Sequence, residues 1–282
     1  MTLGIVGLGL MGGSLALAAR EAGLYEMIIG FDTNTGHEKE AIDLGLVDGV
    51  MALDRLLATA DMVVLAIPVE AIVAMMPELE GLKQTAAVCD LGSTKTCIVE
   101  SIPASVRSRF VAAHPMAGTE YSGPKAAFKS LYADRIVVLC DSEQNSPQSL
   151  AQVQRLFEGV GMRTVLMGAR SHDRHAAFIS HLPHAISYAL ANSVLSQEDK
   201  QSILTLAAGG FEDMSRLAKS SATMWIDIFK QNREPLLDSL RIFDTQLSEV
   251  VKLIEEESWE ELKAWMSSAN TLHSIFRPHP KS

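Results

Sequence analysis

The pattern of hydrophobic and polar positions divides the chain into two parts, with the change near residue 168. In the first part, short apolar runs such as residues 3–6, 27–31 and 62–67 alternate with segments of helical periodicity. This alternation is typical of a parallel sheet whose two faces are covered by helices. We therefore expect an α/β domain over residues 1–168, in which the run at 163–167 closes the sheet.

In the second part, strand-like runs disappear and apolar residues recur three and four positions apart, as on helices. Pro183 is expected to kink one helix, and the pair Gly209-Gly210 to end another. One segment keeps a strict alternation of four and three, formed by Leu236, Leu240, Phe243, Leu247, Val250 and Ile254. Such a seam fits a long core helix within one subunit or a contact between two subunits. We expect residues 169–282 to be all-α and to join two chains in a homodimer.

The first predicted strand runs directly into a glycine-rich turn that opens a helix. Gly7-x-Gly9-x-x-Gly12 has the spacing of a dinucleotide-binding fingerprint, in the order strand, turn, helix. The first glycine permits the tight turn, the second lets the backbone approach a pyrophosphate, and the third lets the helix pack closely. Free N–H groups at the helix start favour phosphate. We expect the cofactor to bind along Gly7, Leu8, Gly9, Leu10, Met11 and Gly12.

The second predicted strand ends in an acid, Asp32, about 20 residues beyond Gly12. A carboxylate at that place accepts hydrogen bonds from the ribose hydroxyls of NAD and repels the 2′-phosphate of NADP. No arginine follows Asp32 directly, so the sequence favours NAD over NADP. The alternative is a glycine-rich turn with an unrelated acid at the end of the next strand.

The composition excludes several classes of function. The chain has 282 residues and a net charge of −10, which argues against nucleic acid or an anionic membrane as the main partner. An anionic ligand must therefore be met by a local cluster of basic groups. The three cysteines lack CxxC spacing and are expected to be reduced thiols. With no signal peptide and no apolar segment long enough to span a bilayer, we expect a cytoplasmic protein.

Ligands of an open parallel sheet bind beyond the carboxyl ends of the strands. Pro68, Ser93 and His114 each follow a predicted strand there. A histidine titrates near neutrality, so His114 can accept a hydroxyl proton while hydride leaves the same carbon; the alternative is a structural histidine. Ser93 can bond the same hydroxyl or the nicotinamide amide, or can cap a loop.

Two histidine pairs, His172 with His175 and His181 with His184, have the spacing that brings side chains to one face of a helix. A metal site is conceivable, but no HExxH motif or cysteine accompanies the pairs, so we predict no metal. Further along, Arg216 follows the glycine pair. Its guanidinium can grip a carboxylate with two hydrogen bonds, or can form a surface pair with Glu212 or Asp213.

Together these segments resemble the prephenate/arogenate dehydrogenase family of tyrosine biosynthesis. The matching motifs are GLGLMG at 7–12, DLGSTK at 90–95, HPMAGTE at 114–120, SHLPH at 180–184 and GGFEDMSR at 209–216, followed by Trp225. The resemblance implies an α/β Rossmann-type N-terminal domain followed by an all-α dimerisation domain. It also implies NAD-dependent oxidation of a cyclohexadienol at C4, with loss of CO₂ and aromatisation.

The resemblance further implies roles for individual residues. His114 would accept or polarise the C4 hydroxyl proton, and Ser93 would orient the hydroxyl and the nicotinamide. Arg216 would hold a substrate carboxylate, and Glu120 would act as a gate. Ser180, His181 and His184 would line the substrate pocket, with Asp32 and Pro68 at the cofactor. Lys95 is a weaker candidate for an additional positive charge.

Prephenate and arogenate differ only in a keto or an amino group, and the motifs with Asp32 favour prephenate. A β-hydroxyacid dehydrogenase is a rival, but it needs a catalytic lysine where this chain has histidine-rich motifs. A non-catalytic NAD-sensing module would need an effector surface, such as a basic DNA-reading helix, and none is evident. We expect neither a fused chorismate mutase segment nor a C-terminal regulatory domain, so inhibition by tyrosine is expected to be competitive at the active site.

Overall fold

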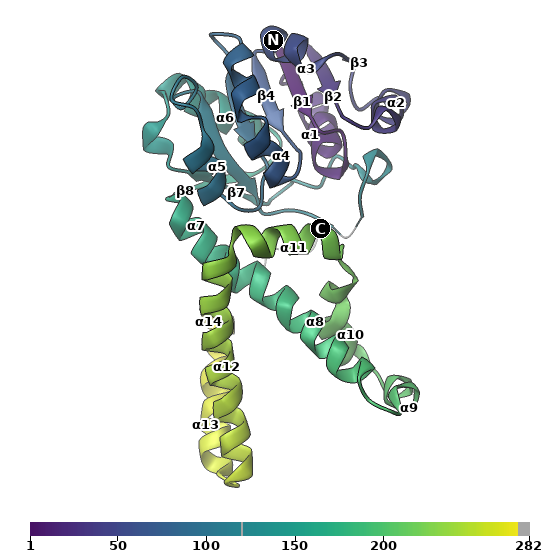
Figure 1. Cartoon of the computed structure of the whole chain (residues 1–282), viewed down its shortest axis with the longest axis vertical. Coiled ribbons are helices and arrows are strands. Elements are labelled where there is room, and N and C mark those ends of the chain that lie inside the picture. The colour runs from purple at the N-terminus through teal and green to yellow at the C-terminus, as the bar shows by residue number, and fades with distance from the viewer. Residues whose placement is uncertain (120, 276–282) are drawn as a thin grey trace.

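The computed structural model describes residues 1–119 and 121–275. Figure 1 shows an α/β part with a helical part attached below it. The helical part has two diverging arms, one containing α8 and α10 and the other α12 and α13, while α11 runs close beneath the α/β part. The two arms leave an open angle between them in the single chain.

One eight-stranded sheet, ordered β3-β2-β1-β4-β5-β6-β7-β8, forms the centre of the α/β part. Its strands are β1 (Thr2–Val6), β2 (Met27–Phe31), β3 (Gly49–Val50), β4 (Met62–Leu65), β5 (Ala87–Asp90), β6 (Phe110–Pro115), β7 (Ile136–Cys140) and β8 (Arg163–Met167). The end of β1 lies between its two neighbours, since Val6 is in register with Phe31 of β2 and Leu65 of β4. The expected strand at 163–167 is therefore confirmed as the last of the sheet.

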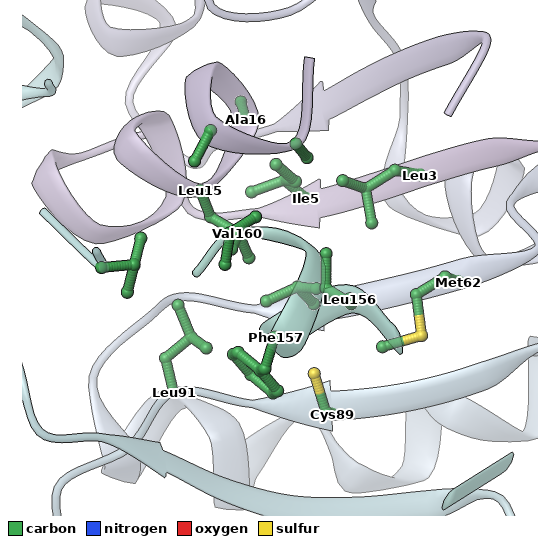
Figure 2. Close-up of a cluster of buried hydrophobic side chains, with 14 of the residues drawn as sticks. Leu3, Ile5, Leu15, Ala16, Met62, Cys89, Leu91, Leu156, Phe157 and Val160 are labelled. Carbon is green, nitrogen blue, oxygen red and sulfur yellow. The ribbon is translucent and has the colours of Figure 1, made fainter. Parts of the chain in front are cut away.

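Helices cover both faces of this sheet, as predicted. The helices are α1 (Leu10–Glu21), α2 (Thr35–Asp43), α3 (Leu53–Thr59), α4 (Val69–Ala74), α5 (Thr96–Ser101) and α6 (Pro147–Gly159). Alternate residues of β4 enter different cores: Met62 and Val64 pack on one face, Val63 and Leu65 on the other. Figure 2 shows the first core, in which Leu3 and Ile5 of β1 pack with Leu15 and Ala16 of α1 and with Leu156 and Phe157 of α6.

The predicted parallel sheet has one exception, between β6 and β7. These strands are antiparallel, with Ala112 paired to Cys140 and Pro115 to Val137, whereas β7 and β8 are again parallel. A parallel neighbour needs a crossover connection of a dozen or more residues, usually a helix. In the described part of residues 116–135 the only helical element is the short 3-10 helix η2 (Pro124–Ala126), so the chain returns beside β6 in the opposite direction.

Every element described after β8 is helical: α7 (Ala169–Ala176), η4 (Ala177–His181), α8 (Leu182–Leu195), α9 (Lys200–Thr205), α10 (Gly209–Ser215), η5 (Arg216–Lys219), α11 (Ala222–Gln231), α12 (Arg233–Glu255), α13 (Trp259–Asn270) and α14 (Leu272–Ile275). Near Pro183 the irregularity takes the form of a π-helical turn, η4, directly before α8. The proline has no N–H to donate and sits in the first turn of α8, where that loss is tolerated.

The prediction that Gly209-Gly210 ends a helix is wrong. The preceding helix, α9, already ends at Thr205, and the two glycines form the first turn of α10. The N–H groups of a first turn have no intrahelical partner, so the weak helix propensity of glycine costs little at this place.

The predicted seam on α12 is only partly buried within one chain. Leu236 is 5% exposed, but Leu247 and Ile254 are 49% and 50% exposed. Other large apolar side chains of the helical part are also exposed, among them Ile179, Leu206, Met214, Trp259 and Met266. No helix in the described ranges combines the length and apolarity needed to cross a bilayer.

Candidate active site

The glycine turn between β1 and α1 is shaped to leave its N–H groups accessible. Gly7 has a φ of +96°, and a Cβ at Gly12 would lie 1.9 Å from the carbonyl oxygen of Gly7. Neither position accepts a side chain without displacing backbone. Gly9 precedes α1 as its N-cap, and no side chain caps that helix start. The turn therefore fits the pyrophosphate of a dinucleotide, as the fingerprint predicts.

Asp32 lies beside this turn at the end of β2. Its carboxylate accepts hydrogen bonds from the backbone N–H of Leu8 and of Asn34, both at 2.8 Å. The imidazole of His37 lies 3.4 Å from the same carboxylate. The loop after β4, which leads to the exposed Pro68, also adjoins the turn, because a Cβ at Gly7 would lie 2.4 Å from the carbonyl oxygen of Ala66. Asp32 thus flanks the glycine turn, and Pro68 follows the loop that adjoins it.

A buried ion pair fixes the loop that follows β5. Lys95 and Asp90 pair with their side chains fully buried, and Lys95 Nζ also donates to the carbonyl oxygen of Ala113 at 2.7 Å. Asp90 in turn accepts the N–H of Ala113 at 3.1 Å and that of Gly92 at 2.8 Å. This network joins the loop carrying Ser93 to the end of β6, one residue before His114. Lys95 is therefore placed as a structural cation and has no surface with which to meet a substrate.

His114 is the first member of a chain of three polar side chains. Its Nδ1 lies 2.8 Å from Nε2 of His172, and Nδ1 of His172 lies 2.9 Å from Oδ1 of Asp173. A carboxylate only accepts, so His172 donates through Nδ1, and in its neutral form it accepts through Nε2. His114 must then donate through Nδ1, which leaves the lone pair of its Nε2 free. An imidazole with a free Nε2 is the form that accepts a proton.

Asp173 anchors this series of hydrogen-bonded side chains to the α/β part. Its carboxylate accepts the backbone N–H groups of Lys95 at 2.7 Å and of Thr96 at 2.8 Å, at the start of α5. A second link is the hydrogen bond from Thr94 Oγ1 to Gln231 Oε1 at 2.9 Å. Burial raises the pKa of Asp173, but the hydrogen bonds from His172 and Thr96 outweigh it and leave the pKa below its usual range. Asp173 is thus ionised at neutral pH, and its carboxylate orients His172.

The pKa of His114 lies well below its usual range. Burial is the largest cause, and the electrostatic effects of His172, Lys95 and His181 lower the pKa further. Ser93, on the neighbouring loop, is half-buried, and its hydroxyl has no hydrogen-bond partner among the described residues. The end of the sheet thus presents a neutral imidazole and a free hydroxyl.

The helical part contributes a cluster of aromatic rings. The rings of His184 and Trp225 stack with centroids 3.5 Å apart, and His181 meets Trp225 edge-on at 5.9 Å. Nδ1 of His184 donates to the carbonyl oxygen of Ser180 at 2.9 Å. Trp225 Nε1 is buried and has no hydrogen-bond partner within the described chain. A buried N–H without a partner is uncommon, and it suits an acceptor supplied by a ligand.

Arg216 opens the 3-10 helix η5 and is exposed. No ion pair joins it to Glu212 or Asp213 within the part of the chain that the structure describes, so the predicted alternative of a surface pair is not what is observed. Its charge acts on His184, whose pKa is lowered by burial and by Arg216 against the opposing effect of the Ser180 hydrogen bond. The guanidinium therefore lies near the ring cluster and has no acidic partner there.

The predicted residues are thus found in two groups, one at the carboxyl end of the sheet and one on α7–α11. Glu120 lies outside the described residues. Over those residues, no group of three or more His, Cys, Asp or Glu has the arrangement of a metal site. The sequence patterns indicated no role for Asp173, and they paired His172 only with the exposed His175. The adjacent letters His-Asp at 172–173 were the available signal.

Comparison with known proteins agrees with this geometry. Residues 15–166 match the family model described as prephenate dehydrogenase, nucleotide-binding domain, and residues 168–268 match prephenate dehydrogenase, dimerization domain. The prephenate dehydrogenase of Bacillus subtilis (strain 168) is 32% identical over 276 residues, which cover 95% of this chain and 74% of that protein.

Two solved structures are similar over nearly the whole chain. The prephenate dehydrogenase of Aquifex aeolicus, in complex with hydroxyphenyl propionate and NAD⁺, superposes with a TM-score of 0.91 at 32% identity, covering 98% of each chain. The arogenate dehydrogenase of Synechocystis superposes with a TM-score of 0.84 at 31% identity, covering 98% of this chain and 100% of that one. The α/β domain and the helical domain, with the motifs that connect them, make this chain a member of the prephenate dehydrogenase family.

Proposed function

We propose that this chain catalyses the NAD-dependent oxidative decarboxylation of prephenate to 4-hydroxyphenylpyruvate. The observation that carries the proposal is the His114–His172–Asp173 chain, which leaves a neutral proton acceptor at the end of the sheet. It lies in a protein whose relatives include prephenate dehydrogenases. Membership of this family leaves no reason to retain a β-hydroxyacid dehydrogenase or a non-catalytic module as the function.

The cofactor is assigned to the glycine turn, with Gly7, Leu8, Gly9, Leu10, Met11 and Gly12 along the pyrophosphate and with Asp32 and Pro68 beside it. The open start of α1 and the close approach at Gly12 support this assignment. NAD bound there would supply the acceptor for the hydride that leaves the carbinol carbon of the substrate. Asp32 favours NAD because its carboxylate would repel a 2′-phosphate.

In this mechanism, His114 accepts the hydroxyl proton at Nε2 as the carbon–oxygen bond becomes a carbonyl. Its low pKa keeps the ring neutral at physiological pH, and the hydrogen bond from Nδ1 to His172 stabilises the positive charge that arrives with the proton. The free hydroxyl of Ser93 orients the reacting hydroxyl. The electrons of the carbon–carboxylate bond then move through the ring onto the carbonyl oxygen, CO₂ leaves, and the ring becomes aromatic. The phenolate oxygen takes back the proton held by His114, which gives the phenol and restores the neutral imidazole.

The end of the substrate that lies away from the reacting carbon is assigned to the helical domain. Arg216 grips a substrate carboxylate, and Ser180, His181 and His184 line the pocket with Trp225. The absence of an acidic partner for Arg216 in the described chain and the unpaired Nε1 of Trp225 support this assignment. Glu120 is proposed as a gate on the basis of the sequence motif alone. We propose residues 1–168 as the nucleotide-binding unit and 169–282 as the unit for substrate binding and dimerisation.

We infer that the protein is a homodimer. The exposed apolar residues along α12, together with the match to a dimerisation domain, support a partner chain that covers them.

The three cysteines are free thiols, which suits the proposed cytoplasmic location. Tyrosine, a phenol with the same side-chain carboxylate position as the product, is proposed to compete with prephenate for this site.

Arogenate is the second candidate substrate, because the Synechocystis arogenate dehydrogenase is nearly as similar as the prephenate enzymes. The test is to incubate the purified protein with NAD and each substrate in turn, and to follow the absorbance of NADH. We expect a higher kcat/KM for prephenate. A higher kcat/KM for arogenate would transfer the proposal to that substrate, and no NADH with either would refute the function.

A further inference from the structure

Asn232 is a buried amide at the junction of α11 and α12 that faces two groups on the preceding helices. It is 1% exposed, and its side chain lies outside every motif discussed above. Nδ2 of Asn232 is 2.7 Å from the carbonyl oxygen of Asp173 on α7 and 3.0 Å from Nδ1 of His181 on η4. One nitrogen therefore serves both partners.

The hydrogen bonds of the Asn232 amide determine the tautomer of His181. A backbone carbonyl only accepts, so the atom of Asn232 that faces Asp173 must be the amide nitrogen. That nitrogen carries two hydrogens, and the second points to Nδ1 of His181. Nδ1 must accept it, and a neutral imidazole that accepts at Nδ1 carries its hydrogen on Nε2.

His181 thereby differs from the other histidines of the site. His172 and His184 both carry a hydrogen on Nδ1, because their partners are the carboxylate of Asp173 and the carbonyl of Ser180. His114 also donates through Nδ1. Among these four rings, His181 alone has a hydrogen on Nε2 while neutral. No group of the described chain accepts that hydrogen.

The ring also stays neutral in the physiological range. Burial lowers the pKa of His181 to about 4, with His172 on α7 and His184 on α8 acting in the same direction and Asp173 on α7 opposing them. Asn232 itself carries no charge. The position of one hydrogen, and not a charge, therefore decides what His181 presents to its surroundings.

We propose that Asn232 is a positioning residue that sets His181 as a neutral Nε2–H donor for an acceptor oxygen of the substrate. The proposal rests on the proposed function only for the identity of the substrate. The edge-on contact of His181 with Trp225 puts this donor in the same ring cluster as His184 and the unpaired Trp225 Nε1. Asn232 also ties this cluster to the main chain of Asp173, and through it to the His172–His114 pair.

The first test uses the wild-type protein with ¹⁵N-labelled histidine and two-bond ¹⁵N–¹H correlation spectra at neutral pH. The His181 signals are identified by their loss in His181→Gln. We expect Nε2 of His181 to be protonated and Nδ1 to be bare. A hydrogen on Nδ1, or a mixture of the two tautomers, overturns the proposal. This measurement needs neither turnover nor a folded Asn232 variant.

The second test uses Asn232→Asp, in which a carboxylate that only accepts replaces the donor. Nδ1 of His181 must then be protonated, and the pKa of His181 should rise. Above the new pKa the neutral ring has lost its Nε2 hydrogen, so KM for prephenate should increase at least ~10-fold as pH rises through it. Below the new pKa the imidazolium keeps that hydrogen, and KM should approach the wild-type value. The Kd of NAD should stay unchanged.

Asn145→Asp is the matched control, because Nδ2 of Asn145 also donates to two acceptors, the carbonyls of Arg107 and Phe110, but touches no histidine. We expect it to lose stability without a pH-dependent KM. A pH-independent KM in Asn232→Asp, or the same pH dependence in the control, overturns the proposal. If the wild type fails to oxidise prephenate, the proposed function is refuted, while the NMR spectra still decide the role of Asn232.

Discussion

Nδ1 of His114 and Nε2 of His172 lie 2.8 Å apart and join the end of β6 to the first helix of the helical domain. Nδ1 of His172 donates to the carboxylate of Asp173, so Nε2 of the neutral ring accepts the hydrogen bond from Nδ1 of His114. His114 is left with one free lone pair, on Nε2. The two domains therefore set the protonation state of the proposed catalytic base together.

Replacing the base tests its role directly. In His114→Asn, kcat should fall by ~10²–10⁴-fold, because no proton acceptor remains as hydride leaves. The Kd of NAD should change little, since the glycine turn is untouched. His175→Asn is the control, because His175 lies exposed on the same helix as His172. Steady-state kinetics with prephenate measure both variants, and an unchanged kcat in His114→Asn removes this residue from the mechanism.

The pH dependence of the wild type follows from the low pKa of His114. Catalysis requires the neutral ring, and a pKa lowered by burial and by its neighbours extends the neutral form to lower pH. The value of kcat/KM should therefore stay level as pH falls through 6.5, the usual pKa of histidine, and decrease only at lower pH. A pH series of kcat/KM measures this. A decrease of kcat/KM at low pH with its midpoint at or above pH 6.5 contradicts the assignment of His114 as the base.

Arg216 is predicted to contribute to substrate binding. In Arg216→Ala, KM for prephenate should rise steeply, by an amount equivalent to ~2–5 kcal/mol for a lost carboxylate contact. Arg216→Lys should recover only part of this, since an ammonium cannot make the two parallel hydrogen bonds of a guanidinium. Lys219→Ala, which removes an exposed cation from the same short helix, serves as the control. A change in stability alone, with KM unaltered, would show that Arg216 is not a substrate ligand.

The buried ion pair of Lys95 and Asp90 should contribute strongly to the free energy of unfolding. Lys95→Met leaves the carboxylate of Asp90 buried without its cation and should lower the free energy of unfolding by ~3–5 kcal/mol. Adding Asp90→Asn should restore part of this loss. Lys129→Met, which breaks an exposed pair with Glu21, should cost below ~1 kcal/mol. Urea unfolding compares the variants, and equal losses for the two lysines would refute the role of burial.

Asp32 is predicted to decide between the two dinucleotides. In Asp32→Ser, the ratio of kcat/KM for NAD to that for NADP should fall at least ~10-fold, about 1.4 kcal/mol. The physical reason is the loss of the charge that repels a 2′-phosphate. Some affinity for NAD should also be lost, because Asp32 holds the N–H of Leu8 in the glycine turn. An unchanged ratio would mean that another group selects the cofactor.

The sequence by itself determined the class of the fold and the outline of the site. Apolar runs and helical periods depend on neighbours a few residues apart, so they predicted the strands, the covering helices and the change to an all-helical part. Gly7 and Gly12 were predictable for the same reason, since a tight turn before a helix is a local event. His114, Ser93 and Arg216 entered as candidates from their places next to such local features, and their chemical roles stay predictions.

Only the tertiary structure decided which side chains meet. The reversal of β7 depends on how the loop at 116–135 returns, which no local period encodes. The contacts that orient the site join His114 to His172, Lys95 to Asp173, and His181 to Asn232, across 58, 78 and 51 positions of the chain. Such pairings arise from the packing of α7 against α5 and β7 and of α12 against η4. Because donors and acceptors acquire partners only in that packing, the tautomers of the histidines are a property of the folded chain.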